Sequence, residues 1–258
     1  MLPTLFLSHG APTLVLEDVP ARGFLAGLGT RLGRPKAVLV VSAHWETDRP
    51  LVSAVPRNGT IHDFHGFPRA LYELSYPAPG DVALAERVAG LLRGAGLGAG
   101  LDTARGLDHG AWVPLLLMYP EADIPVLQLS IQTRQGPAYH LALGKALRPL
   151  REDGVLVIGS GSFTHDLTSF RGQGLDAPEP GWVSAFADWT DRALVEGRTD
   201  DLLSYRRLAP HAARNHPTEE HLLPLFAALG AGTEGGKAER LHRSATFGIL
   251  RMDAYAFG

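Results

Sequence analysis

Three histidines of this 258-residue chain follow apolar runs that end in serine or glycine or lead directly into serine. The runs are Thr4–Ser8, Ala37–Val41 and Val155–Gly159, and the histidines that follow them are His9, His44 and His165. Runs of this kind, rich in β-branched residues, are typical of strands buried on both faces. In open α/β sheets ligands bind at the carboxyl ends of the strands. If the three strands are neighbours, the pattern predicts a metal site built from imidazoles.

A further candidate ligand lies in the segment His216-Pro217-Thr218-Glu219-Glu220-His221. Its two histidines are five residues apart, which is not the i, i+4 spacing of a helical zinc pair, so we expect only one to face a metal. His216 precedes a proline and is restricted to extended backbone, whereas His221 falls in the first turn of an expected helix over 217–229. We therefore select His221. Glu219 and Glu220 are alternative ligands, although acidic residues are also favourable at a helix N-terminus.

Other histidines have contexts that indicate acid/base or binding roles. His109 and His165 each stand next to an aspartate, where an imidazole can transfer a proton or bind an anionic substrate. His62 and His65 lie in an aromatic-rich loop and could contact a substrate or simply be solvated. The remaining histidines are expected at the surface, and they are His140, His211 and His242.

Composition excludes several classes of protein. The chain is 45% hydrophobic and 20% charged, without a run of 18 apolar residues, so no membrane span is expected. A net charge of -3 gives no reason to expect nucleic acid or an anionic membrane as partner. The absence of cysteine excludes disulfides, thiolate zinc sites and cysteine nucleophiles, which leaves histidine, aspartate and glutamate as metal ligands. No signal peptide is recognisable, and a cytoplasmic location is expected.

Strand and helix patterns alternate along the chain. Strands are predicted over 4–8, 37–41, 51–55, 125–131 and 154–159, and helices over 21–32, 81–97, 139–150, 182–195 and 217–229. A turn over 108–112 is expected to open a further short apolar helix that ends at residue 118. Two strands with a hairpin near 245–248 are expected in the tail, 205–215 is expected to be irregular, and the aromatic loop 57–80 is expected to be a functional lid. These features predict one α/β domain over 1–258. Its mostly parallel or mixed central sheet would be flanked by helices, with the metal site at the carboxyl ends of the strands.

Seven motifs, in order along nearly the whole chain, resemble those of the DOPA 4,5-dioxygenase family. They are Ser8-His9-Gly10-Ala11-Pro12, Ser42-Ala43-His44-Trp45-Glu46, Ile61-His62-Asp63-Phe64-His65-Gly66-Phe67-Pro68, Tyr76-Pro77-Ala78-Pro79-Gly80, Asp108-His109-Gly110-Ala111-Trp112, Asn215-His216-Pro217-Thr218-Glu219-Glu220-His221 and Met252-Asp253-Ala254-Tyr255. This family belongs to the class III extradiol ring-cleaving dioxygenases.

The resemblance implies a metal ligand set and two further site histidines. It implies that His9, His44 and His221 hold one divalent metal. Other branches of the superfamily use two histidines and a glutamate for Fe(II). His221 stands where that glutamate would be, and three imidazoles would hold Zn(II) as well as Fe(II). His165 resembles the family's acid/base histidine, or alternatively a further ligand, and His109 resembles a second histidine of the substrate pocket.

The implied activity is insertion of O2 into a catechol, such as DOPA or caffeate, to give a ring-opened semialdehyde. His165 would help remove a phenolic proton. The residues expected to contact the substrate are His62, Phe64, Trp45 and His216. Two other functions stay open on the histidine pattern alone. One is a zinc-dependent hydrolase, and the other is a non-catalytic metal-binding interaction protein of the same superfamily.

Overall fold

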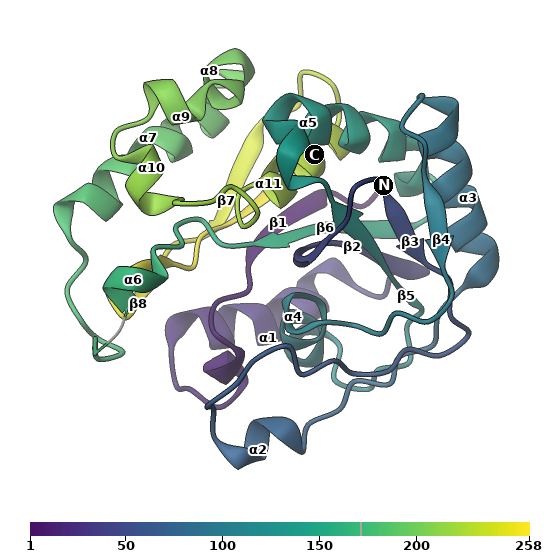
Figure 1. Ribbon diagram of the computed structural model, residues 1–258, viewed down its shortest axis with the longest axis horizontal. Coiled ribbons are helices and arrows are strands. Elements are labelled where there is room, and N and C mark those ends of the chain that lie inside the picture. The colour runs from purple at the N-terminus through teal and green to yellow at the C-terminus, as the bar shows by residue number, and fades with distance from the viewer. Residues whose placement is uncertain (171) are drawn as a thin grey trace.

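An eight-stranded mixed sheet forms the centre of the computed structural model, which describes residues 1–170 and 172–258 (Figure 1). The strand order is β4-β3-β5-β2-β6-β1-β10-β7. The strands are β1 Thr4–Ser8, β2 Ala37–Glu46, β3 Leu51–Ser53, β4 Gly100–Asp102, β5 Val126–Ile131, β6 Val155–Gly161, β7 Ala238–His242 and β10 Ala254–Phe257. Strands β5, β2, β6 and β1 run parallel, and β10 joins β1 antiparallel. Every residue of β1, β5 and β6 is buried, as their unbroken apolar runs require.

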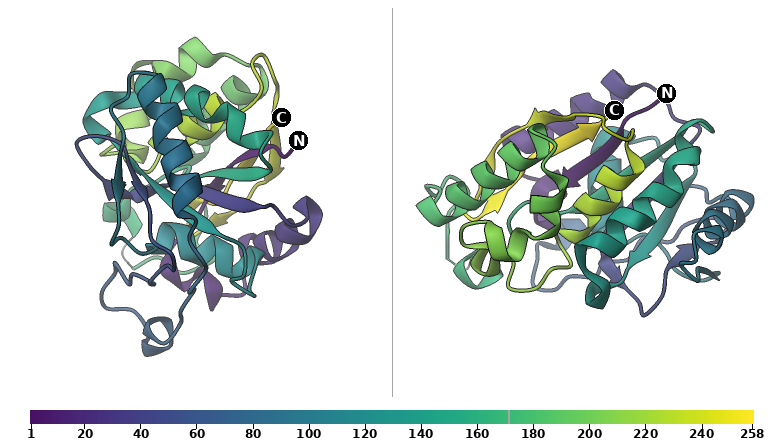
Figure 2. Two further views of the ribbon diagram at one scale, coloured as in Figure 1. Left: turned by 90° about the vertical axis from the view of Figure 1, so that its right-hand side faces the viewer. Right: turned by 90° about the horizontal axis from the view of Figure 1, so that it is seen from above.

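Helices cover both faces of the sheet (Figures 1 and 2). On one face α1 (Pro20–Leu32) packs against α4 (His109–Met118), and on the other α11 (Leu223–Ala231) packs against α5 (Gly136–Leu147) and β6. Helix α3 (Val82–Gly94) lies beside β3 and β4, and α7 (Gly181–Val195) packs on β7. Short helices are η1 Pro12–Val15, α2 Arg69–Tyr72, η2 Thr133–Gln135, η3 Arg148–Arg151, α6 Leu167–Phe170, α8 Thr199–Leu203, α9 Tyr205–Leu208 and α10 Ala212–Asn215.

The predicted α/β class with a mixed sheet is confirmed, and the antiparallel part of the sheet comes from the C-terminal strands β10 and β7. The tail hairpin is also present, as β8 (Ala245–Thr246) and β9 (Leu250–Arg251), although they form a separate two-stranded sheet. In the described part of the chain, no helix is both long enough and apolar enough to cross a membrane.

Three local predictions were wrong. The last helix begins at Leu223 instead of residue 217. Pro224 has no N–H to donate, and its ring would clash inside a helix, so it fits best in the first turn. The stretch 205–215 is not irregular, since it contains α9 and α10. His140 is fully buried: its Nδ1 donates to Gly136 O at 2.7 Å, and its Nε2 accepts from the peptide N–H of Gln132 at 3.2 Å.

Candidate metal centre and active site

The condition on which the metal prediction depended is fulfilled, because β2, β6 and β1 are adjacent and parallel. His9 directly follows β1, His165 follows β6, and His44 lies near the end of β2, where the register against β5 shifts between Val41 and Glu46. His221 reaches the same edge of the sheet from the turn that precedes α11.

Two glycines of β6 allow that turn to approach the sheet. A Cβ atom on Gly161 would lie 2.1 Å from His221 O, and one on Gly159 would lie 2.1 Å from Pro224 O. The peptide N–H of Ser162 donates to His221 O at 2.9 Å, which fixes the turn at the end of the strand. The Gly-Ser-Gly ending of β6 therefore places His221 beside the other histidines.

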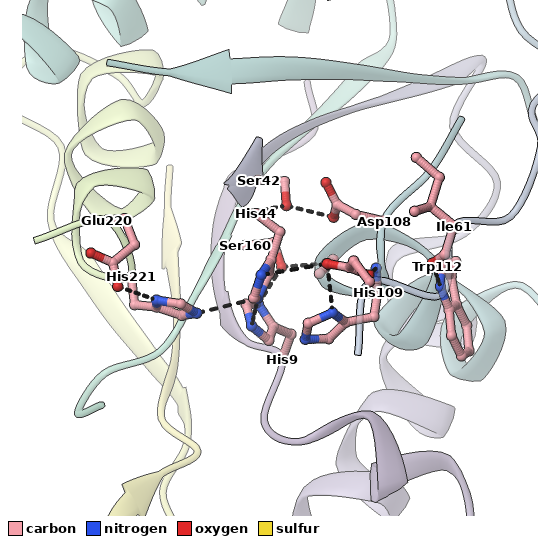
Figure 3. Close-up of polar contacts among 12 residues, drawn as sticks. His9, Ser42, His44, Ile61, Asp108, His109, Trp112, Ser160, Glu220 and His221 are labelled. Carbon is pink, nitrogen blue, oxygen red and sulfur yellow. Dashed lines mark hydrogen bonds and ion pairs between the residues drawn. The ribbon is translucent and has the colours of Figure 1, made fainter. Parts of the chain in front are cut away.

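The Nε2 atoms of His9, His44 and His221 converge (Figure 3). His44 Nε2 lies 3.1 Å from His9 Nε2 and 3.2 Å from His221 Nε2. Two nitrogens that are each about 2.1 Å from one ion lie roughly 3.0 to 3.4 Å apart, so both contacts suit a shared metal.

The outer ring nitrogens of His9 and His221 have acceptors. Ser160 Oγ donates its hydrogen to Gly110 O, so His9 Nδ1, 3.0 Å away, must donate to Ser160. His221 Nδ1 lies 2.9 Å from Glu220 Oε1 (Figure 3). These contacts place the ring hydrogens on Nδ1 and leave the Nε2 lone pairs of His9 and His221 facing inward. Lone pairs that face one another repel unless a cation lies between them, and neutral imidazole is the form that binds metal.

Burial keeps these imidazoles neutral. Burial and, to a smaller extent, the neighbouring His109 lower the pKa of His44 to about 3, although the charges of Asp63 and Glu220 act in the opposite direction. Burial, followed by the effect of neighbouring imidazoles, also lowers the pKa of His9 and that of His221 well below the ordinary value. The three candidate ligands are therefore uncharged at pH 7.

His165 stacks on His221, with ring centroids 3.4 Å apart and planes 13° apart. Its Nδ1 lies 4.0 Å from Glu220 Oε1, the oxygen that also contacts His221. Burial lowers the pKa of His165 to about 4, although the charge of Glu220 acts in the opposite direction. His165 is thus a neutral imidazole that lies next to the three converging nitrogens but is not one of them.

His109 lies on the other side of the cluster, against His44, with ring centroids 3.9 Å apart. Its Nδ1 is 3.0 Å from Asp63 Oδ2, and its peptide N–H donates to Asp63 Oδ1 at 2.9 Å. Burial acts to raise the pKa of Asp63, but hydrogen bonds and Coulombic attraction from His109 outweigh it and hold this pKa at about 2. Asp63 also lies 3.5 Å from His44 Nδ1, so one carboxylate contacts both rings.

A cavity of about 560 Å³ opens onto these histidines. Its lining includes all five of them, and one wall is apolar, made by Ala11, Pro12, Phe64, Phe67, Leu167, Phe170 and Leu250. This volume is in the range of small-molecule sites, and a wall of this kind suits a flat aromatic ring. The aromatic loop supplies Phe64, His65 and Phe67, in agreement with its expected position over the site.

Of the four predicted substrate contacts, only Phe64 lines the cavity. Trp45 points to the opposite side of β2 from His44, because successive strand residues alternate, and Arg105 lies over its ring at 4.8 Å. His62 contacts Leu74 O at 3.0 Å, beneath Phe64. His216 is fully buried and donates to Phe163 O, so the structure places these three residues outside the cavity.

Asp63 and Ser160 also belong to the site, although no role was predicted for either from the sequence. Asp63 lies inside the motif that contains His62 and Phe64, so its position in that motif was a signal. Ser160 had none, because a serine at a strand end is common and its contact with Gly110 O exists only in the folded chain.

The chain matches a family described as the catalytic LigB subunit of aromatic ring-opening dioxygenase over residues 3–258. A protein named 4,5-DOPA dioxygenase extradiol from Beta vulgaris is 46% identical, covering 98% of this chain and 96% of its own. A protein of the same name from Escherichia coli is 43% identical, covering 89% of this chain and 85% of its own. The crystal structure of an uncharacterized Escherichia coli K12 protein superimposes with a TM-score of 0.83 at 35% identity, over the whole of both chains.

The fold and the site together define an aromatic ring-opening dioxygenase. The chain belongs to the family of catalytic LigB subunits of these enzymes. The predicted enzyme class, extradiol ring opening, is confirmed by the family and by the relatives' names.

Proposed function

We propose that the chain binds one Fe(II) ion through His9, His44 and His221 and opens the ring of a catechol, such as DOPA or caffeate, with O2. The observation that carries the proposal is the convergence of three Nε2 atoms at the floor of an aromatic-walled cavity. Iron is preferred to zinc because ring opening by O2 needs a redox-active metal, and zinc has no redox chemistry. When bound, Fe(II) would supply the electron transfer that makes O2 reactive toward the ring.

The chain's own residues would orient the substrate and move its protons. His165 is neutral and lies beside the proposed ligands, so it can take a proton from a catechol hydroxyl. Its Nδ1 is 4.0 Å from Glu220 Oε1, the nearest carboxylate, so we assign the ring hydrogen to Nδ1 and the role of proton acceptor to Nε2. After ring opening, the same imidazole can return the proton to the product.

His109 and the apolar wall would hold the ring. Asp63 fixes the His109 imidazole, whose Nε2 is then available to hydrogen-bond an oxygen of the substrate. The faces of Phe64, Phe67 and Phe170 would pack against the catechol and exclude water from reactive oxygen species.

The test starts from anaerobically purified protein, whose bound metal is measured before Fe(II), O2 and a panel of catechols are added. We expect O2 uptake that is stoichiometric with a visible-absorbing semialdehyde, and neither signal from the His44→Ala variant. If the protein holds zinc tightly and consumes no O2 after exchange to Fe(II), the proposal is wrong, and assays for hydrolase activity become the next step.

A further inference from the structure

The backbone of His44 lies at an interruption of the sheet. On the β5 side, regular pairing ends at Val41 and resumes only at Glu46. The peptide N–H and C=O of His44 therefore need partners outside the strand ladder. The N–H donates to Ser42 Oγ at 3.2 Å, and the C=O accepts from Arg105 Nη2 at 3.1 Å.

Both partners are held by one carboxylate, that of Asp108. Ser42 Oγ donates to Asp108 Oδ1 at 2.7 Å (Figure 3). Arg105 Nη2 donates to Asp108 Oδ2 at 3.0 Å. The two oxygens of Asp108 thus fix the two groups that bind the His44 backbone, one at each end of the residue.

Asp108 is itself rigidly placed. Its side chain is fully buried. Gln128 of β5 donates to Asp108 Oδ2 through Nε2 and accepts the Asp108 peptide N–H through Oε1, the latter at 3.1 Å. The Gln128 peptide N–H donates to Ser53 Oγ at 2.8 Å, so the network is anchored in the sheet. A buried carboxylate with three donors on its oxygens has little freedom to move.

The same segment also supports a second proposed ligand. Gly110 O accepts the hydrogen of Ser160, and Ser160 accepts from His9. A Cβ atom on Gly110 would lie 2.7 Å from Ser42 Oγ and 3.1 Å from His44 Cδ2, so only glycine leaves room for this arrangement. Residues 108–110 are therefore in contact with the supports of both His9 and His44.

We propose that Asp108 is a positioning residue, which directs the His44 imidazole toward the metal through Ser42 and Arg105. The inference rests on the proposed metal site and adds a role for a residue that touches neither metal nor substrate. Replacing the carboxylate by an amide puts an NH2 group against a donor and removes the charge that holds Arg105. The His44 backbone would then lose a fixed partner on at least one side.

The experiment measures binding of Co(II) by chelator competition, together with the visible absorption bands of bound Co(II), which report ligand geometry. Asp108→Asn should weaken Co(II) binding roughly 10- to 100-fold, the usual effect of removing a residue that orients a metal ligand, and shift the bands. Ser42→Ala removes one of the two connections and should weaken binding by roughly three- to tenfold. In the Asp108→Asn/Ser42→Ala double variant the loss of affinity should be smaller than the product of the two single losses, because Ser42 and Asp108 support His44 through a shared hydrogen bond.

Asp191→Asn is the matched control. Asp191 accepts from Tyr255 Oη and Arg240 in a partly buried ion pair on α7, away from the cavity. The Asp191→Asn substitution should lower thermal stability and leave the affinity for Co(II) and the Co(II) spectrum unchanged. Circular dichroism of each metal-free variant checks the fold, and Ser42→Ala decides the question if Asp108→Asn does not fold.

His44→Ala separates the two levels of inference. If it leaves Co(II) affinity unchanged, the metal-site proposal itself fails. If His44→Ala abolishes binding while Asp108→Asn and Ser42→Ala keep wild-type affinity and spectrum, only the positioning role of Asp108 is overturned.

Discussion

One carboxylate oxygen of Glu220 lies close to the Nδ1 atoms of two histidines, His221 and His165. Oε1 lies 2.9 Å from Nδ1 of His221 and 4.0 Å from Nδ1 of His165. The two imidazole rings are stacked, with an angle of 13° between their planes. The rings of the proposed metal ligand and the proposed base therefore stack face to face, and the same carboxylate oxygen lies near both. The family resemblance left open whether His165 is a base or a fourth ligand, and its closeness to His221 is compatible with either role.

Replacing His165 by Gln separates these two roles. As a base, His165 contributes to proton transfer only, so the variant should keep its metal while turnover falls by about two to four orders of magnitude. Metal content and O2 uptake are measured on the same preparation. Loss of metal together with activity would make His165 a ligand instead.

Replacing Gly161 by Ala tests the approach of the His221 turn to β6. A methyl group would meet His221 O at 2.1 Å, so the turn must move away from the sheet and carry its imidazole with it. We expect lower thermal stability and reduced metal content. Gly27→Ala in α1, where a Cβ meets nothing within 4 Å, is the control and should be neutral or stabilising by up to about 1 kcal/mol. Full metal content in Gly161→Ala would argue against His221 as a ligand.

Phe64 and Trp45 allow the cavity wall to be tested with a matched pair. Phe64→Leu keeps most of the volume but removes the aromatic face, so KM for a catechol should rise roughly three- to tenfold with metal content unchanged. Trp45→Phe should leave KM as it is, because Trp45 lies outside the cavity. A larger effect of Trp45→Phe than of Phe64→Leu on KM would reverse this assignment of the wall.

His140 should make the protein sensitive to acid. Burial lowers its folded-state pKa to about 4, although the hydrogen bond to Gly136 O acts in the opposite direction, and the unfolded chain takes up the proton near pH 6.5. Stability from neutral His140 is therefore complete above pH 6.5 and decreases as the pH falls toward 4, by about 3 kcal/mol for this group.

The measurement for His140 is urea unfolding of the metal-free protein between pH 7 and pH 4. The His140→Gln variant keeps a group that can accept from Gln132 N–H but does not titrate, so its stability should depend less on pH than that of the wild type. Equal slopes for the two proteins would show that His140 does not titrate differently on folding.

The sequence by itself determined the fold class and most residues of the candidate site. Unbroken apolar runs can be buried only as central strands, and residues that end such strands must meet at one edge, so His9, His44 and His165 were predictable from local pattern. The absence of cysteine limited the ligands to histidine and carboxylate, and ordered motifs predicted the family.

Only the tertiary structure decided the direction and partners of these side chains. His44 lines the cavity and Trp45 lies on the other side of β2, and the late start of α11 places His221 on a turn. The residues that support the proposed ligands are far from their partners in the sequence, as in the contacts of Ser160 with His9 and of Asp108 with Ser42. Local patterns encode burial and periodicity, whereas these hydrogen bonds depend on distances that exist only after the sheet has assembled.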